Sequence, residues 1–501
     1  MTYEELLNTK NNLESQANEL LNKNKYLENE VDYLKQVVKL FKEEKFGIKT
    51  EQYLEENLQL IFNEIEQEAK DEQLPLEQEH ISYVRKKGRG KKKDFPEHLP
   101  REEKIIDIAE SEKTCPHDGT ILKQIGFDLV EKIKTVPAQS SILVEKTLKY
   151  ACPCCELHLA QGKANSILPK TVATPEVLSF LIFSKFFQGL PFYRLEELYK
   201  LQGIHLTRGT MARWLIGVSE KLVPVWNVLE ERVLNSGYMA IDATHVQVLK
   251  EKGRPAKDKS FMWVRGSPEQ GIVLFDYNIS GGGKIAKNLI AGFKGGVQAD
   301  AHKGYGALDK TEILLLGCMM HARRRFHKAW LGGDKKPGLA EIGLKMFKRL
   351  YRYEKAYKEA GLSRERRYEA RQKEVAPYMD KIKKWCEKKR PKVIKESPLG
   401  NAINYFINEY EELSNFLKSG RYEIDNGWVE RMIRKFAIGR NNWLFSDTVE
   451  GAHASSILYS FALTAKVNNK DPFKVMTEIF KNLPDAETLE DYEELADLLT
   501  K

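Results

Sequence analysis

Three acidic residues could place a carboxylate at a reactive site. Asp242 lies in the first predicted strand, in the segment 241–246, where its apolar neighbours indicate burial and a buried charge is costly unless a positive group meets it. Asp300 ends a second predicted strand, and strand ends in α/β folds are common positions for functional sites. Glu430 lies in a predicted helix, with Arg434 four residues later. Taken singly, the aspartates fit capping or turn roles, and Glu430 fits a surface ion pair with Arg434.

Cysteines offer a second kind of chemistry. Three of the six fall in one tetrapeptide, Cys152-Pro153-Cys154-Cys155. Six cysteines in 501 residues do not resemble a disulfide framework, so the cluster favours metal binding in a reducing compartment. Cys318 and His321 have Cys-x-x-His spacing, but no second pair accompanies them, and we expect them to pack in the core.

Positive residues are clustered although the net charge is only +8. Such clusters suit a polyanion, with nucleic acid as the first candidate and an anionic membrane surface as the second. The clusters comprise Arg85, Lys86, Lys87, Arg89, Lys91, Lys92 and Lys93 in one run, and Arg323, Arg324 and Arg325 in a triplet.

The composition, the first residues and the length of the apolar runs predict a cytoplasmic protein. Hydrophobic residues make up 42% and charged residues 30%, the balance of a globular protein in solution. The first residues lack the basic and apolar regions of a secretory signal. The longest apolar run, residues 313–320, is far shorter than the roughly 18 residues that a spanning helix needs. We therefore expect no membrane contact.

Leucine recurs every seven residues near the start of the chain. Leucine at the d position, with a mixed a position that includes Asn24, is typical of a parallel dimeric coiled coil. The alternative is an amphipathic helix packed on its own chain. We expect residues 1–46 to form the coiled coil and residues 1–41 to hold a homodimer or higher oligomer together. The leucines are Leu6, Leu13, Leu20, Leu27 and Leu34.

Three further segments precede the predicted sheet. Residues 47–100 should be a helix near 51–70 followed by a basic linker, which is either simply solvated or follows a DNA backbone. Residues 101–165 carry the cysteine cluster. Residues 166–235 read as a helical, helix-turn-helix-like DNA-binding module, with helices predicted at 195–201 and 210–222, although such helix pairs abound in ordinary domains. Arg208 and Arg213 of this module are candidate DNA contacts.

The remaining pattern predicts an α/β core of the ribonuclease H type, because three neighbouring strands are followed by alternating helix and strand. This core would span 236–448, with a charged helical insertion at 336–418 and a C-terminal helical segment at 449–501. The whole chain is thus predicted to be multidomain and mainly α. The predicted strands are 238–249, 260–265, 272–278, 296–300 and 313–316, and the predicted helices include 284–293, one from about 321 and 428–437.

Five blocks in the same order carry a family resemblance. The segment 425–445, with Glu430-Arg431, Arg434 and Gly439-Arg440-Asn441-Asn442-Trp443-Leu444-Phe445, resembles the catalytic-glutamate region of the insertion-sequence sixty-six family of bacterial transposases. Residues 88–101 are similar to that family's linker and residues 115–155 to its zinc module. Residues 190–214 are similar to its helical module, and His321-Ala322-Arg323-Arg324-Arg325-Phe326 also matches. The resemblance covers almost the whole chain.

The resemblance implies a transposase that cuts transposon ends and joins them to target DNA. It implies a catalytic trio, carried here by Asp242, Asp300 and Glu430. Mg²⁺ (or Mn²⁺) prefers hard oxygen ligands, and two ions roughly 3.5–4 Å apart stabilise the attacking and leaving oxygens of an in-line displacement. We therefore expect two such ions per active site. Ala243 replaces a frequent second acidic residue and Ala301-His302 replaces a common Gly-Tyr pair, but every catalytic carboxylate is present.

The resemblance also implies one structural zinc, which needs four ligands. Cys152 and Cys155 have the spacing of a ligand pair, but upstream Asp118 replaces the second cysteine of the usual pair. His117 is a softer ligand than Asp118 and therefore suits zinc better. The alternative to a bound zinc is a module that has lost its metal. The expected ligands are Cys115, His117, Cys152 and Cys155, for which Cys154 or Asp118 could substitute.

Several arginines surround the expected trio along the sequence. They are either solvated helix charges or phosphate contacts that position DNA without reading its bases. These are Arg323, Arg324, Arg325, Arg434 and Arg440.

Two other functions compete with transposition. One is a non-catalytic DNA-binding regulator derived from a transposase, against which the retention of all three carboxylates argues. The other is a ribonuclease-H-like nuclease without strand transfer, which would not need the leucine heptads. As a transposase the chain would be nucleoid-associated, and the resemblance implies small accessory proteins encoded by the same element.

Overall fold

The computed structural model describes residues 140–146, 149–151, 159–161, 166–169, 171–300, 312–333 and 337–501, with single positions between 16 and 38. The predicted zinc ligands Cys115, His117, Cys152 and Cys155 and the basic run 85–93 lie outside the described residues. The chain divides into two compact units, residues 72–145 and the remainder. All helices and strands named below belong to the second of these.

Strands and helices alternate along the described chain. The strands are β1 Lys149–Ala151, β2 Leu159–Gln161, β3 Tyr238–Lys250, β4 Lys259–Ser267, β5 Ile272–Asn278, β6 Gly295–Gln298, β7 Ile313–Leu316 and β8 Ser446–Thr448. The helices before the insertion are α3 Pro175–Ile182, α4 Phe192–Leu201, α5 Arg208–Leu234, α6 Gly283–Leu289 and α7 Met319–Gly332. The later helices are α8 Leu339–Glu359, α9 Arg364–Ala370, α10 Ala376–Lys389, α11 Pro398–Asn408, α12 Tyr410–Ser414, α13 Gly427–Trp443, α14 Val449–Val467, α15 Pro472–Asn482 and α16 Leu489–Thr500.

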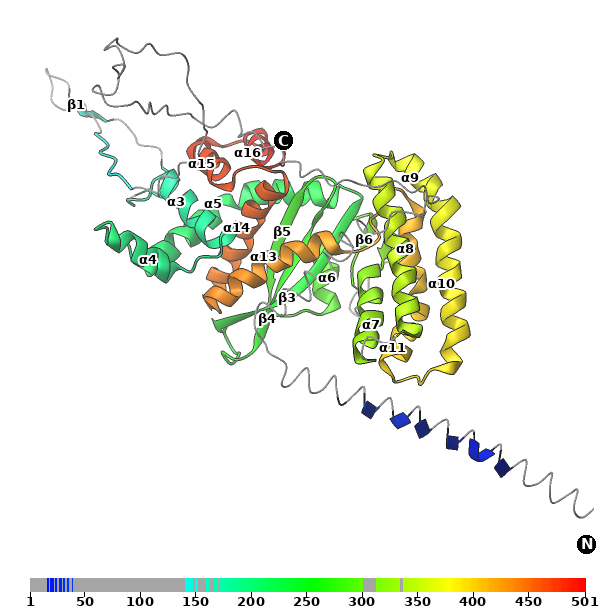
Figure 1. The fold of residues 1–501 in the computed structure, drawn as a ribbon. Helices are drawn as coiled ribbons and strands as arrows, with labels where there is room; N and C mark the ends of the chain where they lie inside the picture. Colours follow the sequence, from blue (N-terminus) through cyan, green and yellow to red (C-terminus); the bar gives the residue numbers. More distant parts are fainter. Residues whose placement is uncertain are drawn as a thin grey trace, which may run out of the picture. The chain divides into compact units, whose positions relative to one another are not determined.

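The main sheet is mixed, with the order β5-β4-β3-β6-β7, and β8 also pairs with β3 (Figure 1). The strands β3, β4 and β5 are antiparallel neighbours, as their short connections require. The β6 strand runs parallel to both β3 and β7. The predicted series of three strands followed by alternating helix and strand is therefore confirmed, and β3 lies at the centre of the sheet.

Three predicted boundaries differ from the structure. The helix predicted at 284–293 ends at Leu289, since its C-cap residue Ile290, with φ −114° and ψ 17°, has left helical geometry. The helix predicted to begin at Thr210 begins at Arg208, with Thr207 as its N-cap, and continues through Pro224 to residue 234. The strand predicted to end at Asp300 pairs only as far as Gln298.

Helices α13 and α14 pack on the sheet (Figure 1). Aromatic side chains lie in the contact. Phe275 of β5 contacts Phe436 of α13 and Tyr459 of α14, with ring centroids 6.1 and 5.4 Å apart. The sheet shares this core with residues of the segment 166–235, which was predicted to form a separate module. Residues of the C-terminal helices also belong to the same core. Because one continuous core joins these segments, the helix that carries Glu430 is held firmly against β3 and β4.

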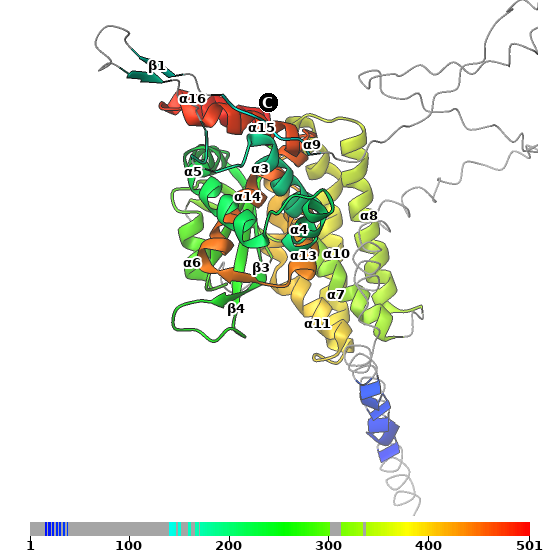
Figure 2. The same cartoon turned by 90° about the vertical axis from the view of Figure 1, so that its left-hand side faces the viewer.

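The helices of the insertion have a core of their own. Phe326 of α7, Phe347 of α8 and Phe406 of α11 are fully buried there. Figures 1 and 2 both show α7, α8, α10 and α11 side by side as a bundle. The bundle is joined to the sheet beside β7, where Asn415 donates a hydrogen bond to the main-chain oxygen of Leu315 over 2.8 Å.

The positions described between residues 16 and 38 are helical, and their apolar side chains are exposed. Leu20, Leu27 and Leu34 are 66%, 47% and 53% exposed. Among the residues that the structure describes, nothing covers these leucines, as the coiled-coil prediction requires. Pairing of two helices stays a prediction. Within the described residues, no helix is long and apolar enough to cross a membrane.

Candidate active site

The central strand β3 positions Asp242. Its side chain is partly buried, and its Oδ1 accepts a hydrogen bond from the main-chain N–H of Ala243 over 2.8 Å. Burial, reinforced by the negative charges of Glu430 and Asp300, raises the pKa of Asp242 to about 7. The positive charge of Arg324 acts in the opposite direction but does not offset this rise in the pKa of Asp242.

Helix α13 positions Glu430, and the residues before the helix set its direction. Asp425 accepts hydrogen bonds from the main-chain N–H of Gly427 over 2.9 Å and from Tyr351 of α8 over 2.7 Å. Asn426, only 1% exposed, donates from its side-chain amide to the main-chain oxygen of Ile241 over 3.0 Å. These bonds join the start of α13 both to the insertion and to β3, so Glu430 faces the strand that carries Asp242.

Asp300 and Glu430 meet at one histidine. His321, in the first turn of α7, has its Nδ1 3.5 Å from Oδ1 of Asp300 and 3.7 Å from Oε1 of Glu430. Asp300 follows the end of β6, which pairs in parallel with β3. The sheet and two helices therefore bring together carboxylates that are far apart in the sequence.

A single arginine neutralises part of this negative charge. Arg324 Nη2 lies 3.2 Å from Oε2 of Glu430 and donates a hydrogen bond to it. Burial nevertheless raises the pKa of Glu430, with Arg324 acting in the opposite direction. Burial also lowers the pKa of His321 to about 4, so its imidazole is neutral at pH 7.

The residues present fit a divalent cation. Oε1 of Glu430 is buried and has no hydrogen-bond partner, although a buried carboxylate oxygen is costly to leave unsatisfied. Asp242 and Asp300 add further hard oxygen donors, the type that Mg²⁺ and Mn²⁺ prefer. A cation at this point would satisfy the free oxygen of Glu430 and would offset the burial and the repulsion that raise the pKa of Asp242.

The other predicted DNA-contacting arginines are distributed over several elements. Arg208 and Arg213 are exposed at the start of α5, where Arg213 donates to Thr210 over 3.2 Å. Arg325 is exposed and lies 4.1 Å from the ring centroid of Tyr405.

Arg323, Arg434 and Arg440 are more enclosed. Arg323 is buried at 5% exposure and Arg434 is partly buried in α13. Arg440 donates from Nη1 to the hydroxyl of Thr244 over 3.2 Å and to the main-chain oxygen of His245. Arg440 thus joins α13 to β3 directly.

The sequence-based prediction for His321 was wrong. Cys318 is fully buried, as predicted, and accepts a hydrogen bond from the main-chain N–H of Asn426. His321 instead points at two of the predicted catalytic carboxylates, and Cys318, His321 and Glu430 have possible ligand atoms within 4.8 Å of one another. The signal that could have found this was the Cys-x-x-His spacing immediately before the arginine triplet.

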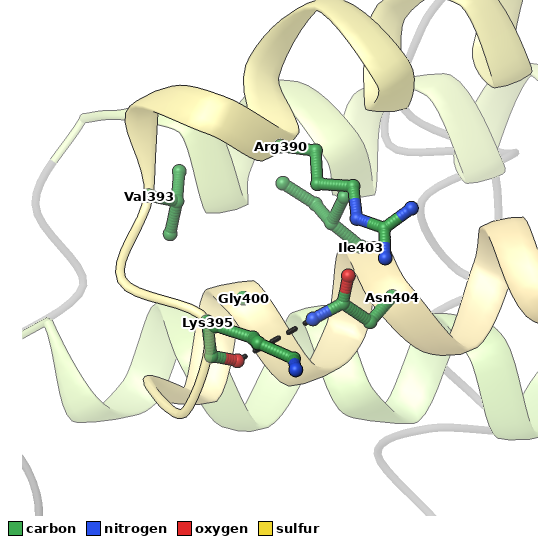
Figure 3. Close-up of a pocket in the computed structure, with 6 residues that line it drawn as sticks. All are labelled: Arg390, Val393, Lys395, Gly400, Ile403 and Asn404. Carbon is green, nitrogen blue, oxygen red and sulfur yellow. Dashed lines mark hydrogen bonds between the residues drawn. The ribbon is translucent and has the colours of Figure 1, made fainter.

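A small pocket lies in the insertion, and none of the three predicted catalytic carboxylates lines it (Figure 3). Its volume of about 170 Å³ is smaller than the roughly 300 Å³ of typical ligand pockets. Asn404 donates to the main-chain oxygen of Lys395 over 3.4 Å at its floor. The lining residues are Arg390, Val393, Lys395, Gly400, Ile403 and Asn404, none of which is acidic.

Known proteins resemble this chain over most of its length. The model described as "Transposase IS66 family" matches residues 170–454, which is more than half of the chain. "Transposase C of IS166 homeodomain" matches residues 33–103, and "zinc-finger binding domain of transposase IS66" matches residues 112–156.

Relatives in Sinorhizobium fredii (strain NBRC 101917 / NGR234) include the uncharacterized proteins y4hP, y4jD and y4qI. They are 25%, 27% and 27% identical to this chain, over 81%, 79% and 79% of its length. The aligned parts cover 76%, 79% and 76% of the relatives themselves.

Proposed function

Because the chain belongs to the IS66 family of transposases, we propose that it cuts transposon ends and joins them to target DNA, with Asp242, Asp300 and Glu430 as its catalytic carboxylates. One observation carries this proposal. Asp300 and Glu430 are far apart in the sequence, yet their oxygens lie 3.5 and 3.7 Å from the same nitrogen of His321. The third carboxylate, Asp242, is close enough for both charges to raise its pKa.

The three carboxylates would hold two Mg²⁺ or Mn²⁺ ions. Ions bound there would stabilise the attacking and leaving oxygens of a phosphodiester during in-line displacement. Arg324 holds the second oxygen of Glu430, so the first remains directed into the site. Asn426 and Arg440 hold α13 against β3 and so keep Glu430 near Asp242.

The strand order supports a ribonuclease-H-like core at 236–448. Three antiparallel strands are followed by two parallel ones, and the carboxylates sit on the central strand, after β6 and on a helix that packs on the sheet. Such a core would act on DNA at the nucleoid, in the cytoplasm. The arginines predicted to contact DNA would then bind phosphates near this site.

The segments before the core would bind and pair transposon ends. The matched zinc-finger family supports a structural zinc at Cys115, His117, Cys152 and Cys155. The exposed leucines between residues 16 and 38 support self-association through residues 1–41. Small accessory proteins of the same element would complete the assembly.

Isosteric variants test the catalytic trio. Asp242→Asn, Asp300→Asn and Glu430→Gln should each reduce cleavage and joining by about 1,000-fold, the loss of about 4 kcal/mol of transition-state stabilisation. The assay would use a donor plasmid with the inverted repeats that bracket this reading frame. The affinity for those repeats, measured by gel shift, should stay within about twofold of that of the unmodified protein, because phosphate contacts supply most of the affinity.

The matched control is Asp447→Asn. Asp447 pairs with Lys250 at the surface and is 58% exposed, so its loss should leave joining unchanged. Joining at the level of the unmodified protein by any of the three site variants would remove that residue from the active site.

A further inference from the structure

His321 is placed where a further metal ligand would be. Its Nδ1 is buried and has no hydrogen-bond partner, and the same is true of Oε1 of Glu430, 3.7 Å away. Buried polar atoms without partners are uncommon, and an absent ion is one of their standard explanations. Two such atoms facing each other indicate that something belongs between them.

The distances exclude an ordinary hydrogen bond and suit a shared cation. An N–H···O bond joins heavy atoms about 2.7–3.2 Å apart, whereas Nδ1 lies 3.5 and 3.7 Å from the two carboxylate oxygens. With ligands about 2.1 Å from an octahedral ion, adjacent ligand atoms lie about 3 Å apart and opposite ones about 4 Å apart. The two distances from Nδ1 of His321 to the carboxylate oxygens fall between these two values.

The neighbouring groups leave Nδ1 available for such an ion. Arg324 binds Oε2 of Glu430, which is the oxygen that does not face His321. Cys318 offers a sulfur to the same cluster, but that sulfur already accepts the main-chain N–H of Asn426. The nitrogen of His321 is therefore the better donor to complete the set that Asp300 and Glu430 begin.

We propose that Nδ1 of His321 is a direct ligand of the divalent ion shared by Asp300 and Glu430, which makes this a mixed nitrogen and oxygen site. Imidazole is a softer ligand than carboxylate, so it strengthens binding of Mn²⁺ and later transition metals more than binding of Mg²⁺. This inference rests on the proposed function, because it assumes that the carboxylates hold an ion. It adds a residue that the carboxylate trio does not contain.

Pulsed electron paramagnetic resonance of bound Mn²⁺ tests the ligand directly. Full-length, untagged, zinc-replete protein loaded with one equivalent of Mn²⁺ should show a nitrogen-14 coupling typical of a bound imidazole. Labelling the protein with nitrogen-15 histidine should change that coupling without altering any residue. His321→Asn should abolish it and weaken Mn²⁺ binding at least about tenfold, with a smaller effect on Mg²⁺ measured by competition.

The matched control is His327→Asn, which changes another histidine of α7 that lies beside Trp330. It should keep both the coupling and the affinity for Mn²⁺. Bound Mn²⁺ without a coupling that depends on His321 would overturn the proposal and leave the carboxylate site intact. Absence of Mn²⁺ binding, or binding that Asp300→Asn and Glu430→Gln do not weaken, would overturn the proposed function as well.

Discussion

The side-chain amide of Asn426 donates a hydrogen bond to the main-chain oxygen of Ile241, the residue immediately before Asp242. The two groups are 3.0 Å apart, and Asn426 is almost completely buried. The main-chain N–H of Asn426 donates a hydrogen bond to the sulfur of Cys318, which lies two residues after β7. One residue therefore connects the strand that carries Asp242, the helix that carries Glu430 and the segment that leads to His321.

Asn426→Ala should loosen the active site more than it destabilises the protein. The lost hydrogen bond should lower the free energy of unfolding by about 1 kcal/mol, measured by urea denaturation. Because Glu430 would then no longer be held near Asp242, joining should fall at least about tenfold and require more Mn²⁺ for half-maximal rate.

The control for this variant is Asn401→Ala, which removes an exposed amide that donates to the main-chain oxygen of Glu396. It should change neither the joining rate nor the Mn²⁺ requirement. An Asn426→Ala protein that loses stability but keeps the normal Mn²⁺ requirement would show that Asn426 has only a structural role.

Asp242 should make the protein less stable as the pH rises. Its pKa is about 7 in the folded chain, above the value of about 3.9 in an unfolded one, so the folded state binds the proton more tightly. That stabilisation is complete at low pH and is lost as the pH rises through about 7. The side chain that Asp242→Asn introduces cannot ionise. In buffer without Mg²⁺ or Mn²⁺ the substitution should therefore be more stabilising at pH 8 than at pH 5, by about 2.5 kcal/mol.

Urea denaturation of both proteins at the two pH values measures this difference. Adding Mn²⁺ at pH 8 should stabilise the unmodified protein more than the variant, because the variant has lost one ionised carboxylate of the site. An equal effect of the substitution at pH 5 and pH 8 would mean that Asp242 is already ionised at pH 5.

The cysteine module should contain zinc. Metal analysis of the purified chain should find about one zinc per molecule, lost on Cys152→Ser or Cys155→Ser. Cys386→Ser is the control, since Cys386 is fully buried in the core of the insertion, outside the predicted module. Zinc-free protein that still folds and binds transposon ends would contradict the predicted site.

The first helix should mediate self-association. Leu20 is 66% exposed, and a leucine stripe is buried only when a second helix covers it. Deleting residues 1–41 should therefore lower the mass seen in sedimentation at matched concentration. Leu20→Pro should do the same, because proline breaks a helix at a cost of about 3 kcal/mol. Equal masses for the full and shortened chains would exclude this contact.

Local patterns in the sequence were sufficient to predict most elements of the core. The strands β3, β4 and β5 and the helix that carries Glu430 follow from apolar spacing, because alternation and helical periodicity depend on neighbouring residues. The identity of the carboxylates came from motifs rather than spacing, since Asp242, Asp300 and Glu430 each had an ordinary structural explanation. Boundaries were predicted less well, as at the end of α6, where the chain leaves helical geometry at Ile290.

The sequence by itself thus determined the order of elements, the α/β character of the core and the residue types available for chemistry. Only the tertiary structure decided that His321 faces Asp300 and Glu430, and that Arg440 joins α13 to β3. These contacts depend on the parallel pairing of β6 with β3 and on the packing of α13 against the sheet. Such pairings join residues far apart in the chain, and no local periodicity records which distant residues will meet.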